Sequence, residues 1–301
     1  MHIKASVLAW AGLELATVAT AQNNTSQCHD YVILSTRGTF EVQGPSIGFP
    51  NMIAWTLGNV TGSVERDTVY PAAKNQTYYF GANDIVSYID SSLESCPNQK
   101  YAVLGYSQGA SASGAALHNY TDPNSAGYKA IKAVLVIGNP YKIPNEDSDV
   151  SQDGSTSNRG FRGVLYNETG PDAYGNGIPD IYYSDGKLLD ICYDKDPVCA
   201  PGMQNTNISA HVQYGVSESV QEMGAKFLIS KLTATNTTSN STDPTTSSGA
   251  SGNSSTGSAT GTSTTAASSS TTSKSGSVIS IQLPTSMFAM VLALMTGVVA
   301  M

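Results

Sequence analysis

Basic residues are scarce in this sequence. Its 301 residues include 15 Lys and Arg against 23 Asp and Glu, which gives a formal net charge of −8, and no basic cluster occurs along the chain. Because an acidic chain repels phosphate backbones, nucleic-acid binding is excluded. Histidine is scarcer still, with 4 residues, and the chain has no CxxC spacing and no Cys/His cluster. We therefore expect no metal and no other cofactor.

Cysteine is also rare: only Cys28, Cys96, Cys192 and Cys199 occur. Together with the leader described next, this even number indicates two disulfides formed in an oxidising compartment. Four cysteines can form two disulfides in three different ways. Cys192 and Cys199 are close enough to close a small loop of their own, which leaves Cys28 to pair with Cys96.

The amino-terminal end differs in composition from the middle of the chain. Residues 1–21 carry Lys4 near the start, then an apolar run, then Ala19-Thr20-Ala21, a small-x-small pattern that is typical of a signal-peptide cleavage site. Glu14 interrupts the apolar part, and an ordinary buried first helix is the alternative. Residues 22–232 have the length of one globular domain with a single core.

The carboxyl-terminal end lacks core-forming side chains until its last residues. Residues 233–277 are almost wholly Ser, Thr, Gly and Ala, which predicts an extended, O-glycosylated stalk. Residues 278–301 close in an apolar run with no basic flank behind it. Small residues near Ser275, a short polar spacer and this tail match a GPI-attachment signal, and a membrane-spanning tail is the alternative. We expect contact with a membrane only through the anchor.

Glycosylation sequons support export. They stand, without an intervening proline, at Asn24, Asn59, Asn75, Asn119, Asn167 and Asn207. With the leader and the anchor signal, they predict an extracellular glycoprotein at the cell surface or cell wall.

Apolar runs alternate with helical patterns in the middle of the chain. Buried strands are predicted at residues 31–36, 100–105, 133–137 and 188–193, with a short strand at 67–70. Helices are predicted from a cap at Asn83, over residues 108–119, and at the end of the domain around Val212, Val220, Met223 and Phe227. Such alternation predicts an α/β fold, a three-layer sandwich with a central parallel sheet. The polar residues 142–176 are expected to form a long surface excursion.

The sequence GYSQG at residues 105–109 has the GxSxG form. The bare pattern is weak evidence in a chain so rich in Gly and Ser, but here a strand precedes it and a helix of small residues follows. This context is typical of a nucleophile elbow, in which a strained turn exposes a serine hydroxyl above the sheet. The pattern predicts Ser107 as a nucleophile.

A serine nucleophile needs a histidine base and an acid that orients it. Of the four histidines, His2 belongs to the leader, His29 precedes the first strand and His118 lies too far along the elbow's own helix. His211 remains. The acid is expected in the small loop between Cys192 and Cys199, where the residues alone leave Asp194 and Asp196 open.

Two donors must face the oxyanion of the tetrahedral intermediate. One is the backbone amide after the nucleophile, that of Gln108. The other is expected from the loop after an early strand, where Arg37-Gly38-Thr39 stands.

Together these motifs resemble the cutinase and acetylxylan esterase family of secreted serine esterases. The matching pieces run in family order: RGTFE at 37–41, YPA at 70–72, GYSQG at 105–109, GIP at 177–179, CYDKDPVC at 192–199 and AHVQYG at 210–215.

The resemblance implies a cutinase-like α/β-hydrolase fold and resolves the open alternatives. The family's acid lies four residues after the first cysteine of the small loop, which selects Asp196. Its histidine falls on His211, and its oxyanion residue on Thr39 with Gln108 as partner. By similarity, the expected disulfides are Cys28–Cys96 and Cys192–Cys199.

We therefore predict a secreted, monomeric serine carboxylic ester hydrolase. Candidate substrates are short acyl esters, acetylated polysaccharide and cutin-like polyester, and the mostly polar residues 200–210 favour short or carbohydrate-borne esters. One alternative is an acetylxylan esterase specifically, since IGNP at residues 137–140 resembles that branch. Another is a catalytically weak, wall-anchored structural or adhesive protein.

Overall fold

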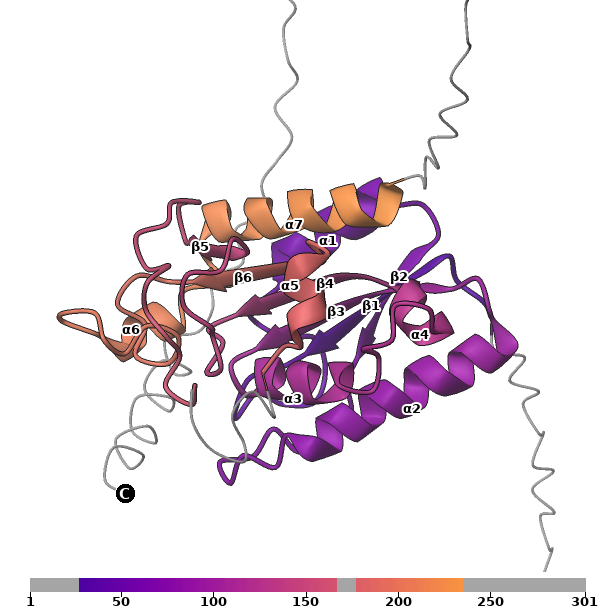
Figure 1. The fold of residues 1–301 in the computed structure, drawn as a ribbon, viewed down its shortest axis with the longest axis horizontal. Helices are drawn as coiled ribbons and strands as arrows, with labels where there is room; N and C mark the ends of the chain where they lie inside the picture. Colours follow the sequence, from indigo (N-terminus) through magenta and orange to yellow (C-terminus); the bar gives the residue numbers. More distant parts are fainter. Residues whose placement is uncertain (1–26, 167–176, 235–301) are drawn as a thin grey trace, which may run out of the picture. The chain divides into compact units, whose positions relative to one another are not determined.

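A computed structural model describes residues 27–166 and 177–234 (Figure 1). The predicted leader, the anchor signal and nearly all of the predicted stalk lie outside the described residues. So do Asn24, Asn167 and the last part of the predicted excursion, residues 167–176.

The described residues form one parallel sheet of six strands in the order β2-β1-β3-β4-β6-β5. The strands are β1 (Tyr31–Thr36), β2 (Ser63–Asp67), β3 (Lys100–Tyr106), β4 (Ile131–Ile137), β5 (Asp149–Ser151) and β6 (Leu188–Cys192). The predicted α/β sandwich with a central parallel sheet is confirmed.

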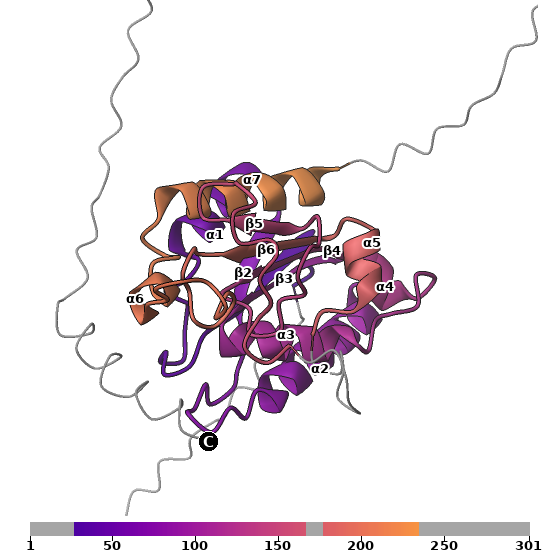
Figure 2. The same ribbon diagram turned by 60° about the vertical axis from the view of Figure 1, so that its left-hand side comes forward.

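Helices cover both faces of the sheet, as Figure 2 shows from the side. One face carries α1 (Pro50–Asn59) and α7 (Glu218–Thr233). The other carries α2 (Tyr79–Ser95), α3 (Gln108–Leu117), α4 (Ala126–Ala130) and α5 (Asp180–Ser184). The short helix α6 (Ile208–His211) lies near the carboxyl end of the sheet (Figure 1).

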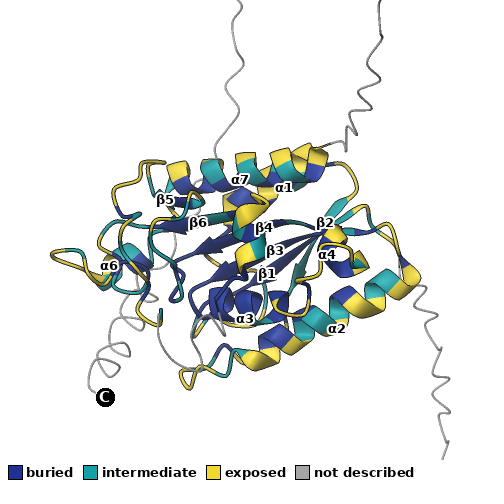
Figure 3. Cartoon of the chain, in the orientation of Figure 1, coloured by how far each residue is buried: buried dark blue, intermediate teal, exposed yellow. Residues whose placement is uncertain are grey.

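The central strands are apolar on both faces because both faces are covered. Successive side chains of a strand point to opposite sides. In β3, Val103 therefore packs into the core under α2 and α3, whereas Leu104 packs into the core under α1 and α7. Figure 3 shows the resulting buried sheet between helices whose outer sides are exposed.

Three predicted elements differ from the structure by more than about two residues. The second strand is Ser63–Asp67 and not 67–70, because the buried guanidinium of Arg37 binds the carbonyl groups of Thr68 and Tyr70. Helix α2 begins at Tyr79, before Asn83. Val212 follows α6 and is not part of α7.

The predicted surface excursion is partly buried. Its residues 149–151 add the edge strand β5 to the sheet, and the side chains of Lys142 and Asp149 form an ion pair of 3.1 Å without exposure to solvent. This part of the chain is therefore built into the domain.

Candidate active site

Ser107 lies on a sharp turn between β3 and α3. Its backbone angles are φ 54° and ψ −117°, a conformation that a residue with a side chain rarely adopts. The serine N–H donates to the carbonyl of Ile137 on the neighbouring strand at 3.0 Å. The turn thereby holds the side chain at the carboxyl end of the sheet.

The two glycines of the motif permit this turn. A Cβ at Gly105 would lie 2.6 Å from the Cα of Ala110, and one at Gly109 would lie 2.1 Å from the carbonyl oxygen of Thr36. Both contacts are with backbone, which cannot move aside cheaply. The helix can therefore pack directly on the strand ends only if both residues are glycine.

Ser107, His211 and Asp196 come together from three separate segments. Nε2 of His211 lies 2.9 Å from Oγ of Ser107, and Nδ1 of His211 lies 2.8 Å from Oδ2 of Asp196. Asp196 is fully buried, while His211 and Ser107 keep exposed fractions of 1% and 9%. A carboxylate next to Nδ1 fixes that nitrogen as the donor, so Nε2 is free to accept the proton of the hydroxyl.

Two tyrosines that the sequence analysis assigned no role support this arrangement. The hydroxyl of Tyr106 donates to the carbonyl of His211 at 2.7 Å, and the hydroxyl of Tyr214 donates to Oδ2 of Asp196 at 2.6 Å. Tyr106 belongs to the motif GYSQG and Tyr214 to the motif AHVQYG, and this position within the motifs is the sequence feature that points to a role in the site. Gly138 completes the support, because a Cβ there would lie 2.8 Å from Cε1 of His211.

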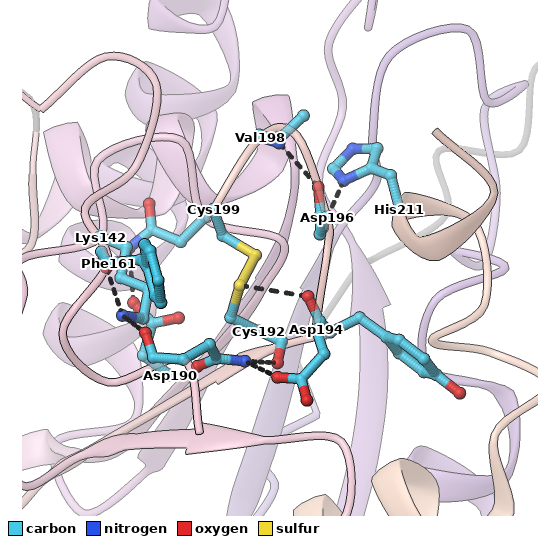
Figure 4. The surroundings of a disulfide bond; sticks show 12 residues. Lys142, Phe161, Asp190, Cys192, Asp194, Asp196, Val198, Cys199 and His211 are labelled. Carbon is cyan, nitrogen blue, oxygen red and sulfur yellow. Dashed lines mark hydrogen bonds and ion pairs between the residues drawn. A yellow bond between two sulfur atoms is a disulfide. The ribbon is translucent and has the colours of Figure 1, made fainter. Parts of the chain in front are cut away.

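The environment of Asp196 keeps its carboxyl ionised. Burial alone raises the pKa of Asp196, but this effect is outweighed by the charge of His211 and by hydrogen bonds from His211, Tyr214 and the N–H of Val198. The net pKa lies below the ordinary value. Figure 4 shows Val198 and His211 on the two sides of this carboxyl group.

Asp194, the other candidate, is directed elsewhere. Its carboxylate accepts hydrogen bonds from Oγ of Ser157 at 2.7 Å and from Nδ2 of Asn158 at 3.0 Å. Figure 4 shows the carboxylate of Asp194 apart from that of Asp196, in the small loop that the Cys192–Cys199 disulfide closes. Of the two acids, only Asp196 contacts His211.

The two expected oxyanion residues come from two segments, Gln108 from the elbow itself and Thr39 from the loop after β1. Gln108 is the first residue of α3, where backbone N–H groups have no partner within the helix, and its side chain donates to the carbonyl of Ala73 at 3.0 Å. Thr39 follows β1, and its hydroxyl accepts a hydrogen bond from Nε2 of Gln76 at 3.2 Å.

The second expected disulfide, Cys28–Cys96, lies away from these residues. It joins the start of the described chain to the end of α2. His118 bonds the carbonyl of Gly177 on the α5 side of the sheet, and the backbone N–H of His29 donates to Oε1 of Gln99.

The sequence profile of the Cutinase family matches residues 27–232. The chain belongs to the cutinase family. Membership of this family, together with carboxylesterases among its relatives, identifies the protein as a carboxylic ester hydrolase.

Named relatives of this cutinase-family enzyme come from bacteria and fungi. It is 29% identical over 235 residues to a probable carboxylesterase, Culp3, of Mycobacterium tuberculosis, covering 74% of this chain and 76% of the relative. A cutinase-like protein from Cryptococcus sp. is 36% identical, with a TM-score of 0.61 over 69% of this chain and 97% of that one. The catalytic core of an acetyl xylan esterase from Trichoderma reesei shares the fold at 21% identity, with a TM-score of 0.53 over 68% of this chain and 100% of that one.

The described residues show neither a metal-binding cluster nor a membrane-spanning helix. Within residues 27–166 and 177–234, no three His, Cys, Asp or Glu side chains are grouped as they would be to hold a metal ion. Over the same residues, every helix is too short or too polar to cross a membrane.

Proposed function

We propose that the enzyme hydrolyses esters through an acyl-enzyme on Ser107. The observation that carries this proposal is the hydrogen-bonded series from Ser107 through His211 to Asp196, at 2.9 and 2.8 Å. In the first half-reaction, Oγ of Ser107 attacks the ester carbonyl carbon while Nε2 of His211 takes the hydroxyl proton. The tetrahedral intermediate then expels the alcohol, which receives that proton from His211. Asp196 keeps the imidazole oriented and stabilises its charged form.

The second half-reaction returns the enzyme to its starting state. Water attacks the acyl carbon, gives its proton to Nε2 of His211, and the acid leaves as the proton returns to Oγ of Ser107. In both halves the negative oxygen receives hydrogen bonds from the backbone N–H groups of Thr39 and Gln108. The contact of Gln76 with the Thr39 hydroxyl supports a fixed position for that residue.

We propose esters of short acyl groups, or acetyl groups carried by polysaccharide, as substrates. The loop of residues 200–210, between Asp196 and His211, exposes no large hydrophobic side chain, which suits a polar alcohol component. A second candidate is cutin-like polyester. It is favoured by Phe40, Val42 and Ile47, which follow the oxyanion residue Thr39 in sequence and are exposed by 38%, 76% and 44%.

Hydrolysis of p-nitrophenyl esters of increasing acyl length tests both points. The full-length chain and its Ser107→Ala variant are produced in a secreting host and compared from acetate upward. We expect a Ser107-dependent rate that falls sharply after acetate. A rate that holds or rises with longer chains would favour the polyester, and equal rates for the two proteins would overturn the serine mechanism and leave a wall-anchored adhesive protein as the alternative.

We further propose that the protein is exported, N-glycosylated and held by a GPI anchor. Its two disulfides suit an oxidising compartment, and the sequon residues Asn59, Asn75, Asn119 and Asn207 are all exposed. At Asn75 and Asn207 the side-chain oxygen accepts a hydrogen bond from the third sequon residue, which leaves the nitrogen for a sugar. Release from cells by phosphatidylinositol-specific phospholipase C, and a loss of mass with an N-glycosidase, are the expected results.

A further inference from the structure

Glu41, the last residue of the RGTFE motif, has no part in the mechanism above. Its carboxylate nevertheless binds the loop between β1 and α1 from within. One oxygen, Oε1, accepts the N–H of Ile47 at 2.6 Å, and the other accepts the N–H of Gly38. The hydroxyl of Ser46 lies 3.2 and 3.1 Å from the two oxygens. A single side chain therefore joins two distant backbone donors of this loop.

These two donors enclose the oxyanion residue. Gly38 directly precedes Thr39, and Ile47 stands near the start of α1. Between them Phe40 adopts a φ of 70°, in the left-handed region, while its N–H donates to the carbonyl of Ala72 at 2.8 Å. A backbone in such a conformation persists only where its surroundings hold it. Glu41 supplies bonds on both sides of this segment.

Gly38 lets the carboxylate and the backbone come this close. A Cβ at Gly38 would lie 2.9 Å from Cδ1 of Tyr106 and 3.2 Å from Oε2 of Glu41. Tyr106 is the residue before Ser107. Gly38 thus packs closely against both the residue before the nucleophile and the Glu41 carboxylate.

The carboxylate is bound mainly by these N–H groups, and the charge of Arg37 makes a smaller favourable contribution. Arg37 directs its guanidinium to the backbone carbonyls of Glu41, Thr68 and Tyr70. Burial raises the pKa of Glu41, and the bonds from Ile47 and Gly38 oppose that rise. An amide could not replace the carboxylate, because glutamine has one accepting oxygen for two donors that reach different atoms.

We propose that Glu41 is a positioning residue that aims the backbone N–H of Thr39 at the oxyanion. The proposal rests on the serine mechanism above. Glu41 touches neither the substrate nor Ser107, and acts by fixing the loop that carries Thr39. Its loss should weaken transition-state stabilisation and leave binding of the ester unchanged.

The test compares Glu41→Gln with Glu94→Gln in the full-length enzyme. Glu94 is an exposed residue of α2, so its variant makes the same chemical change outside the site. For p-nitrophenyl acetate we expect Glu41→Gln to lower kcat about 10- to 100-fold, less than the loss of an oxyanion donor itself, with KM within about twofold. The Ki of a trifluoromethyl ketone, whose adduct with Ser107 carries an oxyanion, should rise by the same factor. Glu94→Gln should change neither value.

A second variant covers the case in which Glu41→Gln does not fold. Glu41→Asp keeps the charge on a side chain one methylene shorter, and the parallel change in kcat and Ki is again expected. A folded variant with unchanged kcat and unchanged Ki overturns the role of Glu41. If instead the unaltered enzyme and Ser107→Ala have equal activity, the serine mechanism itself fails. The two failures are therefore distinguishable.

Discussion

At the scale of single residues, two aspartates in one small loop have different surroundings. Asp196 meets His211 and Tyr214, whereas Asp194 meets Ser157 and Asn158. The difference arises from partners far away in sequence. An acid that orients an imidazole contributes by holding the correct tautomer, and its loss leaves the rest of the site intact.

We predict that Asp196→Asn lowers kcat by about 10³- to 10⁴-fold, because an amide nitrogen that donates to Nδ1 of His211 holds the imidazole in the wrong tautomer, with its proton on Nε2. Asp194→Asn makes the same chemical change in the same loop. It should lower kcat by less than about tenfold, since it disturbs only the hydrogen bonds of that loop to Ser157 and Asn158. Steady-state hydrolysis of p-nitrophenyl acetate measures both. Equal losses in the two variants would contradict the assignment of the acid.

Some residues of the site are predictable from the sequence and others are not. Ser107 and His211 followed from a motif and from elimination, because the chain offers few alternatives. Asp194 and Asp196 could not be separated from the residues alone, since Ser157 and Asn158, which bind Asp194, stand in a polar segment without a recognisable pattern. Tyr106 and Tyr214 do stand inside recognised motifs, but their roles are not predictable from the sequence, because the partner of a hydroxyl group is set by the tertiary structure.

At the scale of elements, the packing of α3 on the sheet depends on Gly109. We predict that Gly109→Ala lowers the free energy of unfolding by about 2–4 kcal/mol, because its Cβ would meet the backbone at the end of β1. Gly58→Ala is the matched control: it lies in α1, and its Cβ would meet nothing within 4 Å. It should raise the free energy of unfolding by about 0.5–1 kcal/mol through reduced freedom of the unfolded chain.

Urea unfolding at neutral pH measures both changes. A Gly109→Ala protein as stable as the unaltered one would show that the elbow helix can shift without loss.

Residues 142–166, which follow β4, are hydrogen-bonded to the loop that carries Asp196. Asn158 donates to the carbonyl of Cys192 and to Asp194, and the N–H of Val164 donates to the carbonyl of Val198 at 2.8 Å. We predict that Asn158→Ala lowers the free energy of unfolding by about 1–3 kcal/mol, because the buried carbonyl of Cys192 loses its donor and the half-buried carboxylate of Asp194 loses one of its donors. Asn124→Ala, at an exposed loop position, should change it by less than about 0.5 kcal/mol. Thermal or urea unfolding compares the two variants. Similar free energies of unfolding would contradict a stabilising role for the hydrogen bonds of Asn158.

The central strands were predictable and the peripheral elements were not. Residues 31–36, 100–105 and 133–137 are mostly apolar on both faces, which is typical of a parallel strand covered on both sides. Helix α1 begins with Pro50, has no side-chain cap and buries only Met52, Ile53 and Thr56, so its pattern is weak. Strand β5 buries Asp149 and Ser151, and polar side chains give no sign of burial until their partner Lys142 is placed.

At the scale of the whole molecule, a buried charge cluster links stability to pH. Asp149 and Asp190 are register partners on β5 and β6, and Lys142 pairs with Asp149 at 3.1 Å. Burial, and then the charge of Asp190, raises the pKa of Asp149 to about 8. Burial also raises the pKa of Asp190, to about 6. Two carboxyl groups thus share one buried cation.

The folded protein therefore holds protons that the unfolded chain, with aspartate pKa values of about 4, has released. Because the unfolded state binds fewer protons, the free energy of unfolding falls as pH rises from about 5 to 8, by at most about 1.4 kcal/mol per pH unit for each proton. Asp196, with its lowered pKa, acts in the opposite direction but only below about pH 4.

We predict that Asp149→Asn flattens this dependence, because its side chain no longer titrates. Urea unfolding of both proteins at pH 5, 6, 7 and 8 gives the two slopes. Identical slopes would mean that Asp149 is not the group responsible.

The Cys28–Cys96 disulfide has a consequence for the speed of folding. Its cysteines are separated by 68 residues and stand just ahead of β1 and β3, whose first residues Tyr31 and Lys100 are register partners. Parallel pairing of distant segments is slow, because the intervening loop must close before any contact forms. In a chain already oxidised at this pair, that closure has been made in advance. The disulfide then holds the first residues of β1 and β3, the strands that lead to Thr39 and Ser107, close together before the strands pair. The refolding time therefore depends on whether oxidation or strand pairing comes first.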